Sequence, residues 1–231
     1  MKTELCAASI EAIYLAKELG IDRVELCQSL EQGGLTPSTG FIEFSLALGI
    51  ETHVLIRPRS GGFRYSEDEV EIMLRDIGEC KEIGANGVVI GVLDEMGFVH
   101  KKAVDMMVQK AGDMQVTFHR AFDDTLDAEK SIDQLVQLGV HRVLSSGLAR
   151  NVELGMPILV EMKKHAGNRI EIMPGGGVSA ANVRKLIELI TPDAVHFSGT
   201  VKHLLDEESM FSETILKVDK QRIERILKEI V

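Results

Sequence analysis

Residues 52–91 read THVLIRPRSGGFRYSEDEVEIMLRDIGECKEIGANGVVIG, and this stretch decides the fold class. A β-branched run, Thr52–Arg57, is followed by an amphipathic helical pattern over Ser66–Ile83 and by a second apolar run at Gly87–Gly91. The helical pattern begins on an N-cap serine and ends before Gly84, which suits a left-handed C-terminal residue. Strand, helix and strand in this order predict one unit of a parallel sheet.

The same alternation extends over the whole chain. Eight candidate strands follow one another at intervals of about 19 to 35 residues, near the ~30 residues of one such unit. They are Glu4–Ala7, Arg23–Cys27, Thr52–Arg57, Gly87–Gly91, Gln115–His119, Arg142–Ser145, Glu171–Met173 and Ala194–Phe197. This count predicts an α/β fold, a single-domain (β/α)₈ TIM barrel over residues 1–231, with a doubly wound open sheet as the alternative. Towards the C-terminus, we expect a mobile loop over Leu204–Leu216 and a closing helix over Ile215–Val231.

Composition excludes several classes of protein. The chain has 231 residues, 26 basic and 36 acidic side chains, and a formal charge of −10, so nucleic acid is not an expected partner. Apolar runs are too short for a membrane span, and the N-terminus carries no signal-peptide pattern. Three cysteines do not make a disulfide framework and indicate a reducing, cytoplasmic compartment.

Each predicted strand alternates between apolar side chains, which we expect to face the helices, and a second set that points into the barrel. This inward set includes three glutamates, two arginines and three histidines. Its members are Glu4, Cys6, Arg23, Glu25, Cys27, His53, Leu55, Arg57, Gly91, Thr117, His119, Glu171, Met173, His196 and Ser198. The alternation does not assign an inward side to the sixth strand.

Charged residues inside a barrel have two interpretations, because barrel interiors are usually filled by Val, Ile and Leu. One is a structural ion-pair network, which suits the deeper residues Glu4, Arg23 and His53. The other is a functional site at the C-terminal ends of the strands, where TIM-barrel chemistry occurs. The inward residues nearest those ends are Cys27, Arg57, His119 and His196.

Two loops predict an anion site. MPGGGVS at Met173–Ser179 follows the seventh strand and leads into a helix that Ser179 caps, and HFSGT at His196–Thr200 follows the eighth. Glycines expose backbone N–H groups, and barrels often bind phosphate after strands seven and eight. A tight turn that only needs positive φ is the alternative. The predicted anion-binding residues are Gly175, Gly176, Gly177, Ser198 and, from the loop after the third strand, Arg59.

Two further loops carry candidate catalytic residues. Arg57 and Arg59 lie in an arginine-rich loop that suits bidentate recognition of carboxylate or phosphate, with an ordinary solvated loop as the alternative. His119 and Asp123 lie within one turn of each other, as an acid–base pair or as a histidine merely oriented by an aspartate.

The cysteines suggest a metal site. Cys6 and Cys27 lie on neighbouring predicted strands, which are about 4.8 Å apart, so their sulfurs can approach if the register allows it. Two such thiols suit Cu(I), and Met173 or a histidine could add a ligand. Buried cysteines that act as small apolar side chains are the alternative, and Cys80 is expected in the core.

Together these motifs resemble the copper homeostasis protein CutC family over nearly the whole chain. The matching stretches are Asp22–Cys27, Gly33–Ser38, Ile56–Arg59, Thr117–Asp123, Ser146–Gly147 and Ile172–Val178. The resemblance implies a TIM barrel, a cytoplasmic homodimer, and Cu(I) handling with Cys6 and Cys27 as ligands. The chain departs from the family pattern at Gly62, where an acidic residue is expected, and at Ser145 and His100, where Thr and Asp are frequent. Because Gly62 has no side-chain carboxylate, no role of the family's acidic residue at this position is expected in this chain.

Two functions follow as hypotheses. The first is Cu(I) binding through the two cysteines. The second is an enzyme acting on a small anionic, phosphorylated metabolite that the glycine loop binds. In it Arg57 and Arg59 would orient the anion, and Glu25 or His119 would move a proton. A dimeric binding protein without turnover is a third possibility.

Overall fold

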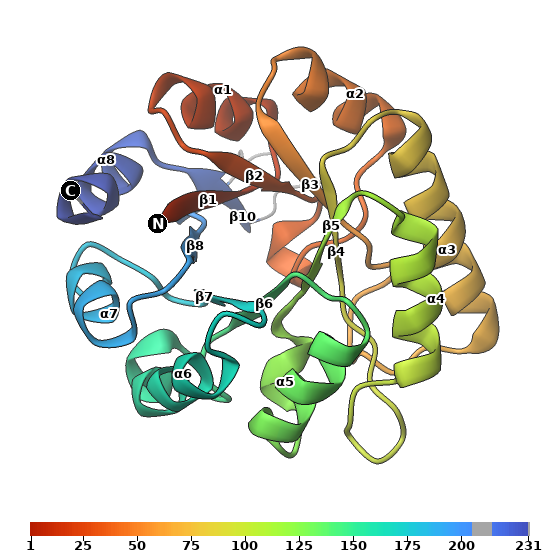
Figure 1. Cartoon of the computed structure of the whole chain (residues 1–231). Coiled ribbons are helices and arrows are strands. Elements are labelled where there is room, and N and C mark those ends of the chain that lie inside the picture. Colours follow the sequence, from red (N-terminus) through yellow and green to blue (C-terminus); the bar gives the residue numbers. More distant parts are fainter. Residues whose placement is uncertain (205–213, 231) are drawn as a thin grey trace.

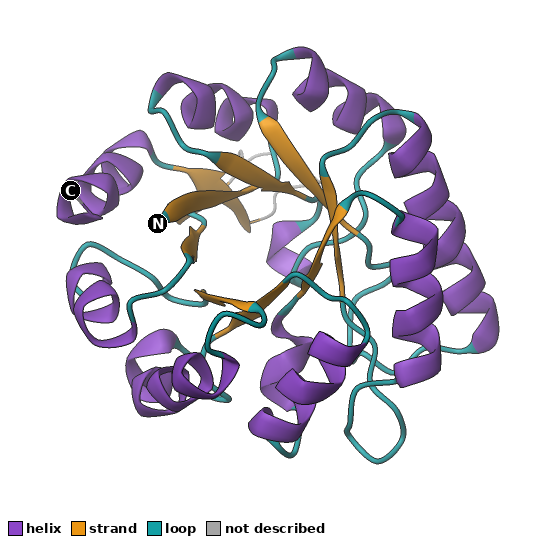
Figure 2. Cartoon of the chain, viewed as in Figure 1, coloured by secondary structure: helices purple, strands orange, loops and turns teal. Residues whose placement is uncertain are grey.

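The computed structural model describes residues 1–204 and 214–230, and it is a ring of eight parallel strands surrounded by eight helices (Figures 1 and 2). The strands are β1 Lys2–Ala7, β2 Arg23–Leu26, β3 Glu51–Leu55, β4 Gly87–Ile90, β5 Gln115–Phe118, β6 Arg142–Ser145, β7 Glu171–Pro174 and β8 Ala194–Phe197. The helices are α1 Ile10–Glu18, α2 Thr39–Ala47, α3 Glu67–Glu82, α4 Lys101–Ala111, α5 Ala128–Gln137, α6 Val152–Ala166, α7 Val183–Ile190 and α8 Lys220–Ile230. Short 3₁₀ helices are η1 Leu30–Gln32 and η2 Arg120–Asp124. The predicted TIM barrel is confirmed, and all eight predicted strands are present.

The strands pair in the order β7-β6-β5-β4-β3-β2-β1-β8, so the ring closes between β7 and β8. Asp193 makes this closure. Its backbone N–H donates to Ile172 O at 3.3 Å, and its carboxylate Oδ2 accepts from Ile172 N at 3.0 Å. Lys163 donates to the same oxygen at 2.6 Å. A side chain therefore supplies part of the hydrogen bonding that strand pairing supplies elsewhere in the ring.

The alternation of side chains along the strands agrees with the prediction. Outward residues such as Val54 and Ile56 belong to the large core between strands and helices. Inside the ring, smaller apolar clusters contain Cys6, Cys27, Leu55 and Val89 in one case and Leu144, Met173 and Ala194 in the other. The sixth strand, which the sequence left undecided, turns Arg142 and Leu144 inward, since Arg142 donates to Thr117 Oγ1 at 3.0 Å.

The helix boundaries follow the caps, with one correction. Ser66 forms a capping box with Glu69 at the start of α3, as the sequence indicates. Ser179, in contrast, does not cap α7, which begins at Val183 after Asn182. The Asn182 side chain accepts from Ser179 N at 2.8 Å and donates to Gly177 O at 2.9 Å. These bonds fold residues 179–182 into a turn, which separates the glycine loop from the start of α7.

The C-terminal prediction was partly wrong. Residues Thr200–Leu204 form β9 and Thr214–Val218 form β10, an antiparallel hairpin. The closing helix α8 is real, but it starts at Lys220 rather than at Ile215. The rest of the predicted mobile loop, residues 205–213, lies outside the described residues. Among the described helices, none combines the length and apolar character of a membrane-spanning segment.

Candidate functional site

A cavity of about 730 Å³ opens at the C-terminal ends of the strands. Its wall includes side chains from β1, β2, β8 and the loops after β3, β5 and β7, and the principal ones are Cys6, Glu25, Arg57, His119, Gly176 and His196. This is the face at which TIM barrels carry their chemistry.

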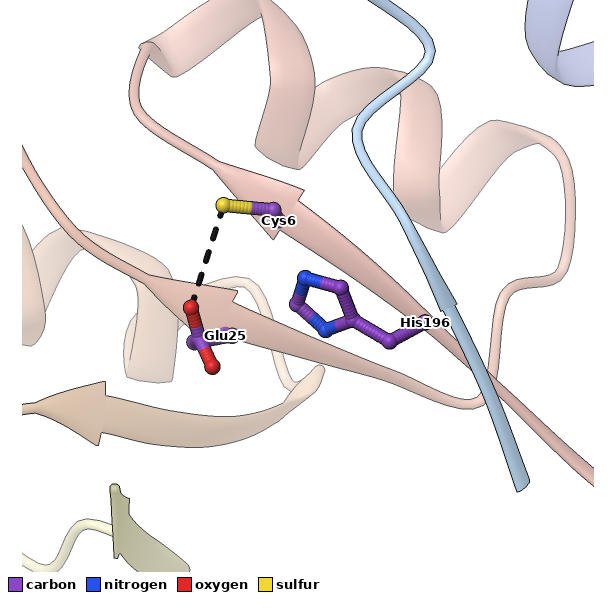
Figure 3. A group of neighbouring side chains, drawn as sticks. All are labelled: Cys6, Glu25 and His196. Atoms are coloured by element: carbon purple, nitrogen blue, oxygen red, sulfur yellow. Dashed lines mark hydrogen bonds between the residues drawn. The ribbon is translucent and has the colours of Figure 1, made fainter. Parts of the chain in front are cut away.

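Cys6, Glu25 and His196 come together on the inner surface of the barrel from β1, β2 and β8 (Figure 3). Their candidate ligand atoms lie within 4.8 Å of one another, and Cys6 Sγ is 3.8 Å from Glu25 Oε1. Strand register produces this group, because Cys6 pairs with Glu25 and His196 pairs with Glu4. All three side chains are buried, so they form a compact site at the base of the cavity.

The charges of this group depend on one another. Burial opposes a charged imidazole, but the Glu25 carboxylate and a 2.7 Å hydrogen bond to Glu4 raise the pKa of His196 above its ordinary value. Burial raises the pKa of Glu25 to about 7. The contact with Cys27, burial and the neighbouring carboxylates raise the pKa of the Cys6 thiol well above its usual range. At neutral pH Cys6 therefore carries a proton that a metal ion would have to displace.

The two predicted metal ligands lie side by side, with Cys6 Sγ and Cys27 Sγ 3.8 Å apart. Cys27 is completely buried and is not part of the cavity wall, whereas Cys6 is. Met173 does not join them, because its sulfur accepts a bond from Arg23 Nη2 at 3.3 Å deeper in the barrel. Cys80 is buried in the outer core, as expected.

The two predicted arginines differ in environment. Arg57 is 6 % exposed and lines the cavity, and its guanidinium donates to the carbonyl oxygens of Gln32, Gly34 and Gly61 at 2.8–3.1 Å. Among the described residues no carboxylate forms an ion pair with it. Its Nε and the hydroxyl of the neighbouring Tyr65 are both buried without a hydrogen-bond partner. Arg59 points elsewhere: it forms an ion pair with Glu69 at 2.5 Å and is absent from the cavity wall.

His119 and Asp123 do not form a pair. His119 lines the cavity, and its Nδ1 accepts from Ala121 N at 3.0 Å. Asp123 accepts from Ser145 Oγ at 2.6 Å, from the Ser146 backbone and from Arg120, so it anchors the loop after β6. Both interpretations of the predicted pair are therefore wrong, because the carboxylate is committed to a different loop.

Residues of the glycine loop form part of the cavity wall. Gly176 and Gly177 line the cavity and have φ of 95° and 87°, the left-handed region that favours glycine. Within the described part of the chain, no acceptor is bonded to the amides of Gly176, Gly177 or Val178. Gly175 instead donates to Ser145 O at 2.9 Å and lies behind the wall. Ser198 belongs to the wall, with its hydroxyl 3.1 Å from Thr200 Oγ1.

The wall residues that were not predicted from the sequence include two arginines of α8. Arg222 and Arg225 reach the wall from α8, beside the glycine loop and Ser198. The sequence shows that the closing helix carries arginines. It does not show that they reach the cavity, which depends on the position of α8 next to β8.

Comparison with known proteins identifies the family. Residues 1–201 match the CutC family. The chain is 40 % identical over 240 residues to a CutC family protein of Glaesserella parasuis serovar 5, covering 100 % of this chain and 99 % of that one. This chain belongs to the CutC family. Another family member, from Photorhabdus laumondii, is 42 % identical over 189 residues, which are 81 % of this chain and 76 % of the relative.

Solved structures agree. The crystal structure named "Putative Copper Homeostasis Protein CutC" from Streptococcus agalactiae has a TM-score of 0.80 and 33 % identity, covering 85 % of this chain and 97 % of that one. A phosphoribosylanthranilate isomerase from Thermotoga maritima has a TM-score of 0.61 at 13 % identity over 99 % of this chain and 98 % of that one, which shows a shared fold alone. Family membership and the TIM barrel are thus established for this chain.

Proposed function

We propose that this CutC family member binds one Cu(I) ion at the base of the barrel cavity, with Cys6 and Cys27 as ligands. The observation that carries the proposal is the 3.8 Å separation of the two sulfurs beside the cavity. Thiolates and imidazoles are the ligands that suit Cu(I), and His196 and Glu25 lie next to Cys6. The relative from Streptococcus agalactiae carries a copper homeostasis name, which supports the choice of metal.

We also propose that the protein is cytoplasmic and forms a homodimer. The three cysteines are all unpaired, which suits the reducing cytoplasm. A homodimer is the assembly that the family resemblance implies. Gel filtration coupled to light scattering at several protein concentrations would check the dimer.

Competition with bicinchoninate under anaerobic conditions tests Cu(I) binding. We expect one Cu(I) per chain. The double variant Cys6→Ser/Cys27→Ser should lose more affinity than the about 10–100-fold that a supporting residue costs. Cys80→Ala, which removes a thiol buried far from the cavity in α3, is the matched control and should bind as the parent does. Equal affinity of the double variant and the parent would overturn the proposal.

A second function is favoured by a different observation, the buried charge of Arg57. A buried cation without a carboxylate is costly unless an anion offsets it. In the same cavity wall, the backbone N–H groups of Gly176, Gly177 and Val178 make no hydrogen bond to any described residue. We therefore propose that the cavity also binds a small anionic metabolite, and that the protein acts on it as an enzyme. In this proposal Gly176, Gly177, Ser198 and Arg57 bind the substrate, and Glu25 or His119 contributes to the chemistry.

Thermal unfolding with added inorganic phosphate tests the anion site. Phosphate should raise the Tm of the parent, and above the Kd the stabilisation should grow with the logarithm of the phosphate concentration. Arg225→Gln removes an exposed charge at the cavity wall and should weaken the effect without disturbing the fold. Lys228→Gln, at the far end of the same helix, is the control. If phosphate leaves the Tm of the parent unchanged, this second function is wrong.

A further inference from the structure

His196 is held in the way that metal-binding histidines are held. Its Nδ1 lies 2.7 Å from Glu4 Oε1, and Glu4 is in turn ion-paired with Arg23. An ionised carboxylate only accepts, so Nδ1 donates, and the neutral ring then offers Nε2 as its free nitrogen. Histidines that bind metals almost always make such a bond through their other nitrogen. Figure 3 shows the ring directed from β8 towards Cys6 and Glu25.

The three side chains are close enough to share one ion. Candidate ligand atoms of Cys6, Glu25 and His196 lie within 4.8 Å of one another, so some point lies within about 2.8 Å of all three. Zinc bonds are about 2.0–2.3 Å long, and side-chain shifts of less than about 1 Å would therefore complete the site. Cys6 Sγ and Glu25 Oε1, 3.8 Å apart, are already near the spacing of about 3.5 Å that tetrahedral bonds of this length set.

The charge of Glu25 favours a cation at this point. Its carboxylate is buried, Oε2 has no hydrogen-bond partner, and among the described residues it forms no ion pair. A buried carboxylate is costly unless a cation or a metal offsets it. A divalent ion between this carboxylate and the Cys6 thiolate would leave the group without net charge.

The kinds of donor atom select the metal. Cu(I) favours soft ligands such as thiolates, whereas a carboxylate is a hard oxygen ligand. One sulfur, one imidazole nitrogen and one carboxylate oxygen suit Zn²⁺, which binds all three. Catalytic zinc sites have three protein ligands and keep a fourth position for water or substrate. Because Cys6, Glu25 and His196 all belong to the cavity wall, a fourth position here faces the cavity.

We propose that Cys6 Sγ, the Glu25 carboxylate and His196 Nε2 bind one Zn²⁺ ion whose fourth coordination position is open to the cavity. Glu4 is then a positioning residue, because it orients the imidazole. Cys27 takes no part in this site. The zinc site and the proposed Cu(I) site share Cys6, so one chain holds one of the two ions at a time.

Competition between the EDTA-treated protein and a chromogenic zinc indicator tests the site. We expect the parent to bind one Zn²⁺ per chain. Glu25→Gln should weaken Zn²⁺ binding by more than the about 10–100-fold that a supporting residue costs, and should leave Cu(I) affinity within a few-fold of the parent. Cys27→Ser should do the reverse. Cys80→Ala, in the outer core, is the matched control and should bind both ions as the parent does.

Co²⁺ in place of Zn²⁺ reports the ligands directly. The parent should show a thiolate-to-cobalt charge-transfer band in the near ultraviolet and the intense visible bands of four-coordinate cobalt. Cys6→Ser should lose the charge-transfer band, and Cys27→Ser should keep it. Azide should shift the visible bands of the parent, because it can occupy the open position.

Three results would overturn the assignment. The first is a parent that binds no Zn²⁺, and the second is equal Zn²⁺ affinity in Glu25→Gln and the parent, with urea unfolding used to confirm that the variant is folded. The third is loss of Zn²⁺ binding in Cys27→Ser, which would place the ion between the two cysteines. Visible Co²⁺ bands that azide leaves unchanged would overturn the open position.

Discussion

At the scale of single residues, Glu4 shows what holds the floor of the barrel together. It is completely buried between Arg23, which it ion-pairs, and His196. Burial opposes its charge, yet the hydrogen bond and charge of His196, with Arg23 and His53, hold the pKa of Glu4 well below its usual range. The deeper charges thus form the structural network that is one of the two interpretations of the sequence.

Replacing Glu4 by Gln should therefore be strongly destabilising. The change leaves the fully buried Arg23 guanidinium with only the 3.9 Å contact to Glu51, and breaking a buried pair on one side costs about 3–5 kcal/mol. Glu71→Gln, which breaks an exposed pair with Arg75 on α3, should cost about 0.5 kcal/mol or less. Urea unfolding of the two variants and the parent measures both values, and a Glu4 variant as stable as the Glu71 variant would contradict the network.

His119 should remain neutral over an unusually wide range of pH. Burial and the charge of Arg57 lower its pKa to about 3, below the 6.5 of an unfolded chain. Since the unfolded state binds the proton first, this group makes stability fall as the pH drops below 6.5, by about 1.4 kcal/mol per pH unit. Long-range ¹H–¹⁵N spectra should show the Nε2–H tautomer between pH 8 and 4. An imidazolium signal from His119 at pH 5 would be incompatible with this environment.

At the scale of elements, one side chain, that of Asp193, supplies part of the closure between β7 and β8. Asp193→Ala removes the acceptor of Ile172 N–H, and an unpaired buried donor costs about 1–3 kcal/mol. Asp193→Asn retains an acceptor oxygen and loses only the ion pair with Lys163, so about 1 kcal/mol or less is expected. Amide hydrogen exchange at Ile172 should accelerate in the alanine variant and much less in the asparagine variant. Equal exchange in both would show that the backbone bond from Asp193 N is sufficient.

The elements that sequence predicted well are those whose patterns are local. Val54 and Ile56 alternate with His53 and Leu55, and a period of two identifies a strand whatever its partners are. Strand β10 was missed because Ile215–Val218 continues without a break into the apolar spacing of α8. What makes this segment a strand is its antiparallel pairing with β9, and no local pattern encodes that contact.

At the scale of the whole molecule, the barrel separates two tasks. Its floor contains buried ion pairs such as Glu4–Arg23 and Arg142–Glu171, whereas Glu25 and Arg57 in its mouth form no ion pair among the described residues. Buried polar atoms without a hydrogen-bond partner occur at both levels. The sequence indicated that Cys6 and Cys27 could meet, since they lie on neighbouring strands. It did not indicate that His196 joins Cys6 and Glu25. That contact needs the ring to close β8 onto β1 in one register, and a shift by one residue would turn His196 towards the helices.

Glu25 lies in the mouth, and we predict that its ionised side chain lowers the stability of the folded protein. Burial raises the pKa of Glu25 from 4.5 to about 7, so the folded state binds its proton more tightly than the unfolded state does. The contribution of Glu25 is therefore lost as the pH rises from 4.5 to 7, and above pH 7 the buried carboxylate is destabilising by about 3 kcal/mol. Glu25→Gln removes the titrating group and should raise the free energy of unfolding relative to the parent at pH 8, with little change at pH 5.

Urea unfolding of the parent and of Glu25→Gln at both pH values measures this difference. Glu67→Gln, an exposed change in the first turn of α3, should show the same small effect at pH 5 and pH 8. A Glu25 variant that is less stable than the parent at pH 8 would mean that the carboxylate is fully offset by His196 and belongs to the structural network of the floor. If Glu25→Gln instead increases the free energy of unfolding at pH 8 only, Glu25 lowers the stability of the parent. A residue that lowers stability is expected to serve catalysis or binding.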